Sequence, residues 1–531
     1  MADFVDFSLI YPSGEAIRRH LSGKDVPNID MYELEELGLD EIFNLRSSRL
    51  CEHLTTDAET LKYRMETFSD MLENEQIGKM LLRLIPVLND ILELRRLTSD
   101  SADPNDYLSS ITEIELYISG INILHSGLKQ AKGGIKSRAF SSLYEKITEL
   151  AESEYYAELN RKLEELTKRV REIKSITVGV NLDAQLRPVS AGVLSINPEK
   201  FKSGDVIEKI LKMNFKGDEY TCIADLVPFS RDSSSNQRTA LSNAFHSAIN
   251  DVYRQSLKSW KKIVQSYVLD NTEFLLNLLP EIEFLVKGTE LLRSLKGKGC
   301  PLCVPDIRPM GECAFEAKSL YNPCVAVKID GETVTNDISF DEKARIYILT
   351  GPNRGGKSVI TCAVGLAVVF MQLGMFVPSE TATISPVDAL FTHFPTGADD
   401  TIDKGRLGEE CARLGQIFDS VSENSLVLLD ESLSSTGAYE ASYIAAEVIA
   451  GFAQVGCRTL FATHLHELSA QLDEIRAKGG ASIDTLVAGI EDGKRSFKIH
   501  RASPDGKSYA RDIAEKYGLT YENIISKINS K

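Results

Sequence analysis

The fold is decided by one stretch of sequence, Gly351-Pro352-Asn353-Arg354-Gly355-Gly356-Lys357-Ser358, which follows the apolar run Ile346-Tyr347-Ile348-Leu349. The stretch fits the pattern G-x-x-x-x-G-K-[ST]. The apolar run predicts a strand and the residues after Ser358 predict a helix, so the glycines form a loop whose backbone N–H groups can surround a phosphate. In such a loop Lys357 reaches the β- and γ-phosphates and the Ser358 hydroxyl holds Mg²⁺. The sequence therefore predicts a nucleotide triphosphate site.

A pair of acids follows about seventy residues later, in the stretch Ser425-Leu426-Val427-Leu428-Leu429-Asp430-Glu431. A continuous apolar run is typical of a strand that is buried on both faces of a parallel sheet. Ligands bind at the carboxyl ends of such strands, which is where the two acids lie. We therefore expect Asp430 to orient the magnesium shell and Glu431 to act as the general base on the attacking water.

A third apolar run, Arg458-Thr459-Leu460-Phe461-Ala462, ends at Thr463 and His464. An imidazole at this sheet edge can contact the γ-phosphate or the attacking water, so His464 is a second catalytic candidate. From Cys300 onward, strands alternate with helices in the pattern of a parallel sheet with crossover helices. The predicted class of this half is thus an α/β domain with a mixed, largely parallel sheet.

Composition limits the partners of the chain. It has 531 residues, 43% of them hydrophobic, and a formal charge of −17, so overall charge will not attract it to nucleic acid or to an anionic membrane. Nine cysteines, an odd number, and a start without a signal-peptide pattern favour a reducing, cytoplasmic location. The uncharged stretch from Ser358 to Ser379 contains Thr361 and Gln372, which favours a buried helix and strand over a membrane span.

The first 300 residues read as mainly helical. We expect a helical core over 1–135, a helical arm with a small strand element over 136–235, a long lever helix within 236–299, and the α/β domain over 300–531. One helix is predicted over 136–175, and it would either project as a coiled coil or pack in a bundle, since its apolar residues recur at heptad spacing. The next long helix is expected to run from the loop at 232–236 to Pro280, the first proline or glycine after that loop.

The motifs of the second half resemble the ATPase domain of the MutS DNA mismatch repair family. The resemblance is carried by the glycine loop, Phe376-Val377-Pro378-Ser379-Glu380, Pro386-Val387-Asp388, Leu428-Leu429-Asp430-Glu431, Ala462-Thr463-His464 with Glu467-Leu468, and Lys507-Ser508-Tyr509-Ala510. It extends from about Cys313 to the end, and residues 50–125 and 235–296 are similar, more weakly, to the family's helical core and lever. The resemblance implies an ABC-type ATPase domain joined to helical levers, a homodimer through the ATPase domains and the C-terminal helical segment, and binding to DNA.

The sequence departs from the family pattern at several places. Relatives have Gly-Arg-Ser-Thr in the segment that acts on the partner's nucleotide, whereas this chain has Gly405-Arg406-Leu407-Gly408. After the acid pair, the family's Gly-Arg-Gly-Thr is replaced by Leu433-Ser434-Ser435-Thr436. We also expect neither the family's N-terminal mismatch-recognition domain nor a C-terminal Smr nuclease domain, so preference for a single mispair is not predicted.

Two further groups of residues are candidate sites. Four thiols, Cys300, Cys303, Cys313 and Cys324, fall within 25 residues and could form a structural zinc site, although free thiols are the commoner outcome. Residues 231–298 hold ten basic and seven acidic residues, with the densest patch at Lys258, Lys261 and Lys262. This patch is either a solvated helix face or a surface that contacts DNA phosphates.

The sequence as a whole therefore predicts a Mg²⁺-dependent ATP hydrolase that couples ATP to clamp-like movement of helical levers on mismatched, damaged or branched DNA. An alternative is an ATP-gated interaction protein that acts on RNA, a ribosome or a protein partner. A phosphate-loop kinase is disfavoured, because the acid pair directly ends a strand and no acceptor-site motif is recognisable. No membrane partner is predicted.

Overall fold

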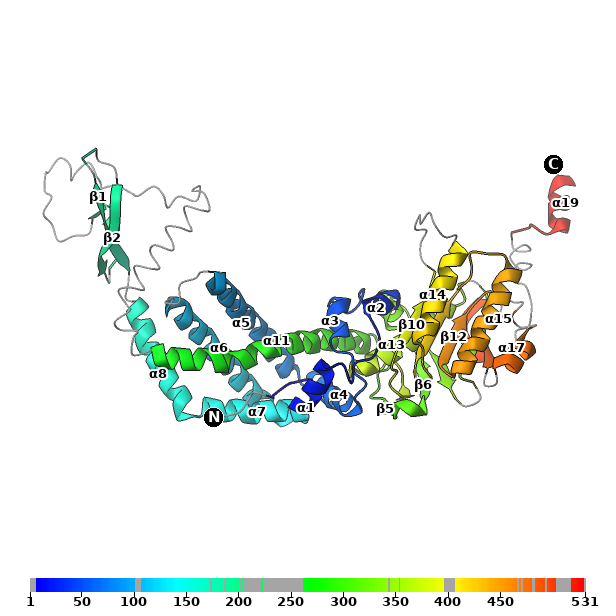
Figure 1. The fold of residues 1–531 in the computed structure, drawn as a ribbon, viewed down its shortest axis with the longest axis horizontal. Helices are drawn as coiled ribbons and strands as arrows, with labels where there is room; N and C mark the ends of the chain where they lie inside the picture. Colours follow the sequence, from blue (N-terminus) through cyan, green and yellow to red (C-terminus); the bar gives the residue numbers. More distant parts are fainter. Residues whose placement is uncertain are drawn as a thin grey trace. The chain divides into compact units, whose positions relative to one another are not determined.

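The structure of the chain is a computed structural model. The structure describes residues 6–100, 107–171, 174–182, 184–185, 188–197, 199–200, 202–203, 221–222, 261–341, 344–352, 354–395, 406–465, 468, 471–479, 483–491, 494–502 and 517–529. The chain divides into two compact units, which are described separately here (Figure 1). Unit 1 comprises residues 1–5, 76–133 and 141–282, and unit 2 comprises residues 6–75, 134–140 and 283–531. The four domain ranges expected from the sequence stay predictions.

Unit 1 is a helical assembly that carries a small antiparallel hairpin. Its main helices are α5 (Glu75–Asp100), α6 (Tyr107–Ala131), α7 (Arg138–Ala151), α8 (Glu154–Arg171) and the first part of α11 (Lys261–Gly297). The predicted strand element is confirmed as β1 (Ser175–Leu182) paired with β2 (Pro188–Asn197). Short strands β3 (Lys202–Ser203) and β4 (Thr221–Cys222) pair in parallel, and the short 3₁₀ helix η1 (Lys132–Gly134) follows α6.

The prediction of one helix over 136–175 is wrong, because the chain breaks between α7 and α8. The Ser153 hydroxyl donates to Leu150 O (2.7 Å) and accepts from Tyr156 N (3.1 Å), which ends one helix and caps the next. The start of α8 packs on α6, where the Tyr156 hydroxyl donates to Ile118 O (3.2 Å). Leu159 and Leu163, two of the apolar residues at heptad spacing, are also buried. The described part of this apolar stripe therefore packs within a bundle.

The end of the lever helix also differs from the prediction. Helix α11 continues past Pro280 to Gly297. Proline removes one backbone hydrogen bond of a helix, but Pro280 is exposed, so the carbonyl that loses its partner can bond to water. The helix ends only before Gly299, which adopts a φ of 75° that favours glycine.

The larger sheet of unit 2 confirms the three predicted strands. Its order is β10-β11-β12-β8-β13-β14, from β10 (Leu390–His393), β11 (Leu426–Asp430), β12 (Arg458–Ala462), β8 (Ile346–Thr350), β13 (Ile483–Glu491) and β14 (Lys494–Arg501). The first five strands are parallel and β14 is antiparallel to β13. The prediction of a mixed, largely parallel sheet is therefore confirmed.

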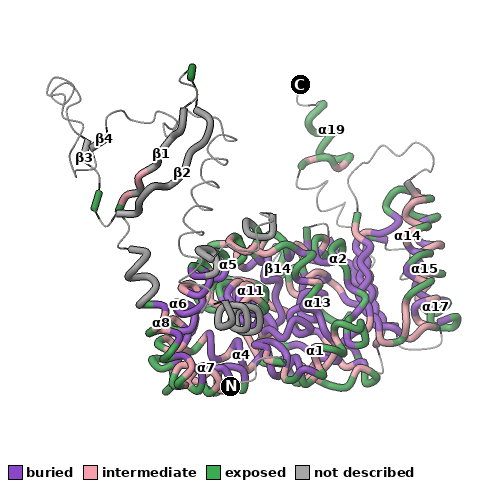
Figure 2. The backbone as a smooth tube through the Cα atoms, turned by 60° about the vertical axis from the view of Figure 1, so that its left-hand side comes forward, coloured by how far each residue is buried: buried purple, intermediate pink, exposed green. Residues whose placement is uncertain are grey.

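Helices cover both faces of this sheet, which explains why its central strands are apolar throughout. Figure 1 shows α14 (Arg406–Ser420) near β10, and α15 (Ala438–Val455) with α17 (Leu472–Gly479) near β12. These three helices share a core with the residues of one face, such as Ile348, Leu429 and Phe461. Helix α13 (Lys357–Gln372) covers the other face, where Gly365 lies against Leu428. The uncharged stretch after Ser358 is thus a buried helix and its following turn (Figure 2).

A second, four-stranded sheet of order β5-β9-β6-β7 completes the α/β part. Its strands are β5 (Asp306–Ile307), β9 (Thr381–Ile384), β6 (Phe315–Leu320) and β7 (Asn336–Phe340), with the helical elements η3 (Met310–Glu312) and α12 (Pro323–Lys328) beside them and α19 (Tyr521–Asn529) near the end of the chain. Within the described residues, none of the helices is both long enough and apolar enough to cross a membrane.

The N-terminal segment, residues 6–57, packs on the α/β part of the same unit. It contains α1 (Gly14–Leu21), α2 (Met31–Glu36) and α3 (Ser47–Cys51) and leads into α4 (Ala58–Glu73). Its backbone forms a bridge to the edge of the large sheet, since Asn28 N donates to Asp388 O and Asn28 O accepts from Leu390 N. Thr55 N also donates to Gln372 O, at the last residue of α13.

A tight joint connects the end of α13 to α4 and α11. The fully buried Arg64 of α4 donates to Ile10 O (3.0 Å) and to Leu373 O (3.4 Å). A Cβ atom on Gly374 would lie 2.5 Å from the Cβ of Arg64, and one on Gly288 of α11 would lie 2.7 Å from the Phe68 ring. The backbone and side chains therefore meet at this joint without intervening space.

Candidate functional site

The glycine loop joins the central strand β8 to the N-terminus of α13. Its backbone needs glycine at Gly351, with a φ of 142°, and at Gly356, with a φ of 94°. A side chain at position 351 would also be too close to the neighbouring strand, because a Cβ on Gly351 would lie 2.8 Å from the Cβ of Ala488 on β13. Arg354 is held at a φ of 60°, a conformation that is strained for a residue with a side chain. Asn353, the remaining predicted contact of this loop, lies outside the described residues.

Lys357 is the buried cation of the loop. The residue is only 4% exposed, and its ammonium group donates to Gly351 O (3.1 Å) and Pro352 O (3.3 Å). Burial lowers the pKa of Lys357, and the nearby carboxylates of Glu431 and Asp430 oppose that shift. A phosphate oxygen is a stronger acceptor than either carbonyl because it is charged. The ammonium is thus placed to exchange its loop carbonyls for phosphate.

The acid pair lies at the same level of the sheet as this loop. Asp430 pairs with Ala462 on β12, and Ala462 pairs with Leu349 on β8, so the three strand ends are aligned. Asp430 is 7% exposed, and its Oδ1 has no hydrogen-bond partner within the described residues. Burial raises the pKa of Asp430, and a hydrogen bond from the Ser358 hydroxyl opposes the shift. Ser358 and Asp430, which are 72 positions apart and were expected to share the magnesium ion, are therefore in direct contact.

These oxygens fit a magnesium ion. Mg²⁺ prefers oxygen ligands and in nucleotide sites is held by one or two protein groups together with phosphates and water. The unpartnered carboxylate oxygen of Asp430 beside the Ser358 hydroxyl supplies such a set. No group of three or more histidines, cysteines or acids that could hold a metal occurs among the described residues, so a cage made of protein ligands alone is not present there.

Glu431 sits in a strained turn directly after β11. Its φ is 48°, and its backbone N–H donates to Ala462 O (2.8 Å), which ties the turn to β12. Leu433, two residues later, has a φ of 63°. Left-handed conformations of this kind cost about 1–3 kcal/mol each and persist only where the surroundings enforce them. The carboxylate is half-buried and lines the same cavity as Lys357 and Ser358.

His464 is placed differently from the acid pair. It follows β12, as predicted, but its side chain is exposed and does not line the cavity. The preceding residue, Thr463, is buried and anchors the chain by donating its N–H to Leu349 O (2.9 Å). The catalytic role of His464 therefore stays a prediction.

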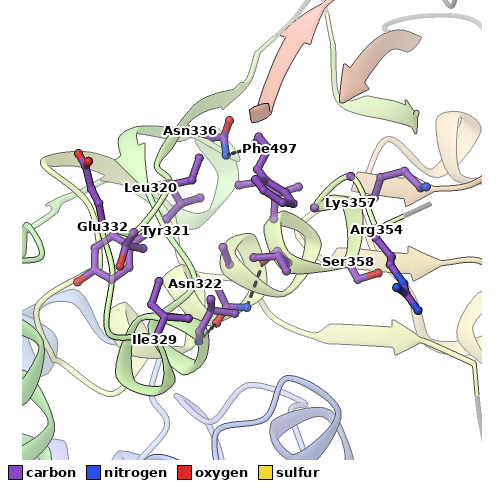
Figure 3. Close-up of a pocket in the computed structure, with 18 of the residues that line it drawn as sticks. Leu320, Tyr321, Asn322, Ile329, Glu332, Asn336, Arg354, Lys357, Ser358 and Phe497 are labelled. Carbon is purple, nitrogen blue, oxygen red and sulfur yellow. Dashed lines mark hydrogen bonds between the residues drawn. The ribbon is translucent and has the colours of Figure 1, made fainter. Parts of the chain in front are cut away.

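The cavity extends well beyond the phosphate loop and has a volume of about 510 Å³ (Figure 3). At one end lie Lys357, Ser358 and Glu431, and the remaining wall is mostly apolar, with Leu320, Tyr321, Val325, Ile329, Val334, Asn336 and Phe497. Asn336 donates from Nδ2 to Phe497 O (3.2 Å), which joins β7 to β14 beside the cavity. Figure 3 shows Phe497 near the start of α13. The sequence motifs do not indicate these wall residues, because they come from strands, a short helix and loops outside the glycine loop and the acid pair.

His393 is a further polar residue that the motifs do not indicate. It ends β10, is 1% exposed, and places Nδ1 2.7 Å from Ser432 Oγ and Nε2 3.2 Å from Glu410 O. Burial lowers the pKa of His393 to about 4, helped by the nearby Arg413 cation. The ring is therefore neutral at physiological pH. Its Ser432 contact lies directly beside Glu431.

The four thiols that were considered for zinc each lie against a different group, and among the described residues they form no group that could hold a metal. The Sγ atom of Cys300 lies 3.6 Å from Thr333 Oγ1, and that of Cys303 lies 3.3 Å from Ser379 Oγ. Cys313 donates to Glu423 O (3.4 Å) and Cys324 to Gly38 O (3.2 Å). A tetrahedral zinc site requires the sulfur atoms to converge on one point.

The predicted DNA contacts and signature segment are only partly described. Lys258 lies outside the described residues, and Lys261 and Lys262 begin α11, although the structure does not describe their side chains. Gly405 also lies outside, and Arg406 is the first residue of α14. The altered loop after the acid pair contacts this helix, since Ser435 Oγ donates to Glu410 Oε2 (3.1 Å).

Comparison with known proteins gives two family matches and many relatives. Residues 56–298 match the MutS2 N-terminal domain, and residues 347–529 match MutS domain V. The DNA mismatch repair protein MutS of Halothermothrix orenii is 37% identical over 210 residues, which is 38% of this chain and 23% of that protein. The protein of the same name from Symbiobacterium thermophilum is 40% identical over 219 residues, or 40% of this chain and 25% of that protein.

These alignments cover about a quarter of the relatives' own length. They and the two domain matches agree with the resemblance inferred from the glycine loop, the acid pair and the Ala-Thr-His segment. The resemblance to the MutS family is thus shown for residues 56–298, which match a domain of MutS2, and for residues 347–529, which match a domain of MutS.

Proposed function

We propose that the chain is a cytoplasmic, Mg²⁺-dependent ATPase with an ABC-type phosphate-loop domain, and that it uses ATP to move helical levers on DNA. The observation that carries the ATPase proposal is the alignment of three strand ends, which brings Lys357, Ser358 and Glu431 to one cavity and places Asp430 in hydrogen-bond contact with Ser358. A free thiol at each of the eight cysteines whose side chains the structure describes is consistent with a reducing compartment.

Each residue of the site has a separate task in this proposal. Lys357 and the N-terminus of α13 bind the β- and γ-phosphates. Ser358 and Asp430 hold the metal ion, which neutralises charge that develops on the phosphates during the reaction. Glu431 accepts a proton from the attacking water. The apolar wall of the cavity, with Phe497 and Tyr321, accommodates the base and excludes solvent from it.

Magnesium removal tests the ATPase proposal. The purified chain is expected to release phosphate from ATP in the presence of Mg²⁺ and to stop when EDTA is added, because Asp430 and Ser358 then have no ion to hold. Excess Mg²⁺ should restore the rate. The melting temperature should be unchanged by EDTA, since the four thiols bond to protein groups and not to a metal. Turnover that persists in EDTA would contradict the assignment.

The DNA and dimer parts of the proposal are supported by the relatives and by local chemistry. The relatives are named DNA mismatch repair proteins, which does not favour the alternative of an RNA, ribosome or protein partner. Residues 231–298 carry a basic excess in an acidic chain. Helix α19 exposes Tyr521, Ile524 and Ile528 at helical spacing, an apolar face that suits a second copy of the chain.

Salt dependence tests DNA binding through the lysine patch. Replacing Lys258, Lys261 and Lys262 together by Glu should weaken binding to every duplex and flatten the salt slope by roughly one unit per lost phosphate contact. Replacing all three by Arg is the matched control and should leave the slope unchanged. Gel shifts with homoduplex, single-mismatch and four-way DNA measure both effects. A strong preference for the single mismatch would contradict the proposal, which predicts affinities within a few-fold.

A further inference from the structure

The turn that carries Glu431 is held in place by its surroundings. Both Glu431 and Leu433 adopt left-handed backbone conformations, with φ values of 48° and 63°. Neither residue is a glycine, so the turn would relax to other conformations without external support. Leu433 provides part of that support because it is buried in the core beneath α14 and α15. The residue between them, Ser432, is also buried and provides the polar part.

Ser432 is fixed by one residue on the neighbouring strand. His393 Nδ1 lies 2.7 Å from Ser432 Oγ, and the Ser432 hydroxyl also lies 3.0 Å from His393 O. The other ring nitrogen, Nε2, lies 3.2 Å from Glu410 O on α14. In a neutral ring, Nε2–H donates to the Glu410 carbonyl, and Nδ1 accepts from the serine hydroxyl, whose single proton is shared with His393 O. Both ring nitrogens are thereby used, which fixes the ring orientation.

Helix α14 is also linked to the end of β10 and to the loop after the acid pair. Arg413 of α14 donates to Phe394 O (3.4 Å), the residue after His393, and it forms an ion pair with Glu36 (3.5 Å). Ser435, in the loop of residues 433–436 that follows the acid pair (the acid loop), donates to the side chain of Glu410 (3.1 Å). The end of β10, the helix α14 and the acid loop are thus linked by side chains from all three. None of His393, Ser432 and Glu410 lines the cavity.

We infer that His393 is a positioning residue for ATP hydrolysis, which acts through Ser432 to hold the Glu431 carboxylate toward the attacking water. The inference rests on the proposed ATPase function and adds a residue to it. His393 does not touch nucleotide. Its loss should therefore impair the chemical step more than ATP binding, because the phosphate loop and Lys357 are untouched.

Two substitutions separate the two hydrogen bonds of the ring. In His393→Asn the shorter side chain can place its amide near the Nδ1 position and keep the Ser432 contact. In His393→Gln the longer side chain can reach Glu410 O and lose Ser432. We expect kcat to fall about tenfold or more in His393→Gln and in Ser432→Ala, with KM for ATP changed less than threefold. His393→Asn and Ser432→Thr, which keep the contact, should retain kcat within about threefold.

A neighbouring residue supplies the matched control. Thr392 lies beside His393 on β10, is buried, and its hydroxyl has no hydrogen-bond partner within the described residues. Thr392→Val should leave kcat and KM unchanged, which controls for disturbance of the strand. The double variant His393→Gln with Ser432→Ala should be no slower than Ser432→Ala alone, because Ser432→Ala already removes the contact that His393→Gln removes.

The outcomes distinguish the inference from the function on which it rests. Wild-type turnover together with an unchanged kcat in His393→Gln and Ser432→Ala would overturn the inference alone. A parallel loss of kcat, ATP affinity and melting temperature would overturn it too, since that is the result of a purely structural role. Absence of phosphate release by the wild-type chain would overturn the proposed function and the inference with it. If His393→Gln does not fold, Ser432→Ala gives the same readout with a smaller change.

Discussion

Replacement of Glu431 by glutamine is expected to lower ATP turnover by about 100-fold or more, because a positioned general base typically contributes at least that factor. ATP affinity should change little. The amide has nearly the same shape as the carboxylate, and Asp430, Ser358 and Lys357 remain in place to bind the metal and the phosphates. Single-turnover phosphate release and calorimetric titration with ATP measure the two quantities separately.

A surface carboxylate controls for the loss of one negative charge. Glu447 on α15 pairs with Lys478 (2.6 Å), and both side chains are about half exposed. Surface pairs of this kind contribute little to stability, so Glu447→Gln should behave as wild type. Near-normal turnover in Glu431→Gln would show that the proton acceptor lies elsewhere. His464, at the end of the neighbouring strand, would then be the first residue to test.

Replacement of Lys357 by alanine is expected to weaken ATP binding by about 100-fold. Hydrogen bonds to charged groups contribute about 1.5–3 kcal/mol each, and the ammonium can donate to two phosphates. A loss of about 2.8 kcal/mol corresponds to a hundredfold change in Kd. Calorimetry with ATP measures the effect directly, and the turnover of this variant should fall with its affinity.

Lys328→Ala is the matched control for charge. Lys328 lies on α12 of the same unit and forms an exposed ion pair with Glu41, so its removal takes away a cation near the cavity without touching the phosphate loop. ATP affinity should be unchanged in that variant. An unchanged Kd in Lys357→Ala would contradict the phosphate-loop assignment as a whole.

The sequence predicted the central sheet because burial on both faces leaves an unambiguous pattern. Runs such as Leu426–Asp430 and Arg458–Ala462 are apolar almost throughout, and the glycine loop fixes the position of the strand before it. The order of the strands then brings the acid pair and Ser358 together, as expected. The heptad spacing also predicts the burial of Leu159 and Leu163, but it does not predict the helix break at Ser153, because apolar spacing continues across the break.

Other parts of the site leave no comparable pattern. His393 reads as an ordinary buried histidine at a strand end, and its contacts with Ser432 and Glu410 depend on how β10, β11 and α14 pack. Phe497 reaches the cavity only because β14 pairs with β13 beside the glycine loop. The bridge from Asn28 to the sheet edge uses backbone atoms, which any sequence can supply. The contacts of His393, the position of Phe497 and the Asn28 bridge all depend on tertiary packing.

The joint around Arg64 has a consequence for how this protein folds during synthesis. The hydrogen bond from Arg64 to Leu373 O connects residues that are 309 positions apart. At a translation rate of about 5–20 residues per second, the second partner leaves the ribosome on the order of 15–60 s after the first. During that interval Arg64 can already donate to Ile10 O and His53 O, but its bond to Leu373 O cannot form. The N-terminal segment of a nascent chain therefore completes its fold only after α13 has been made.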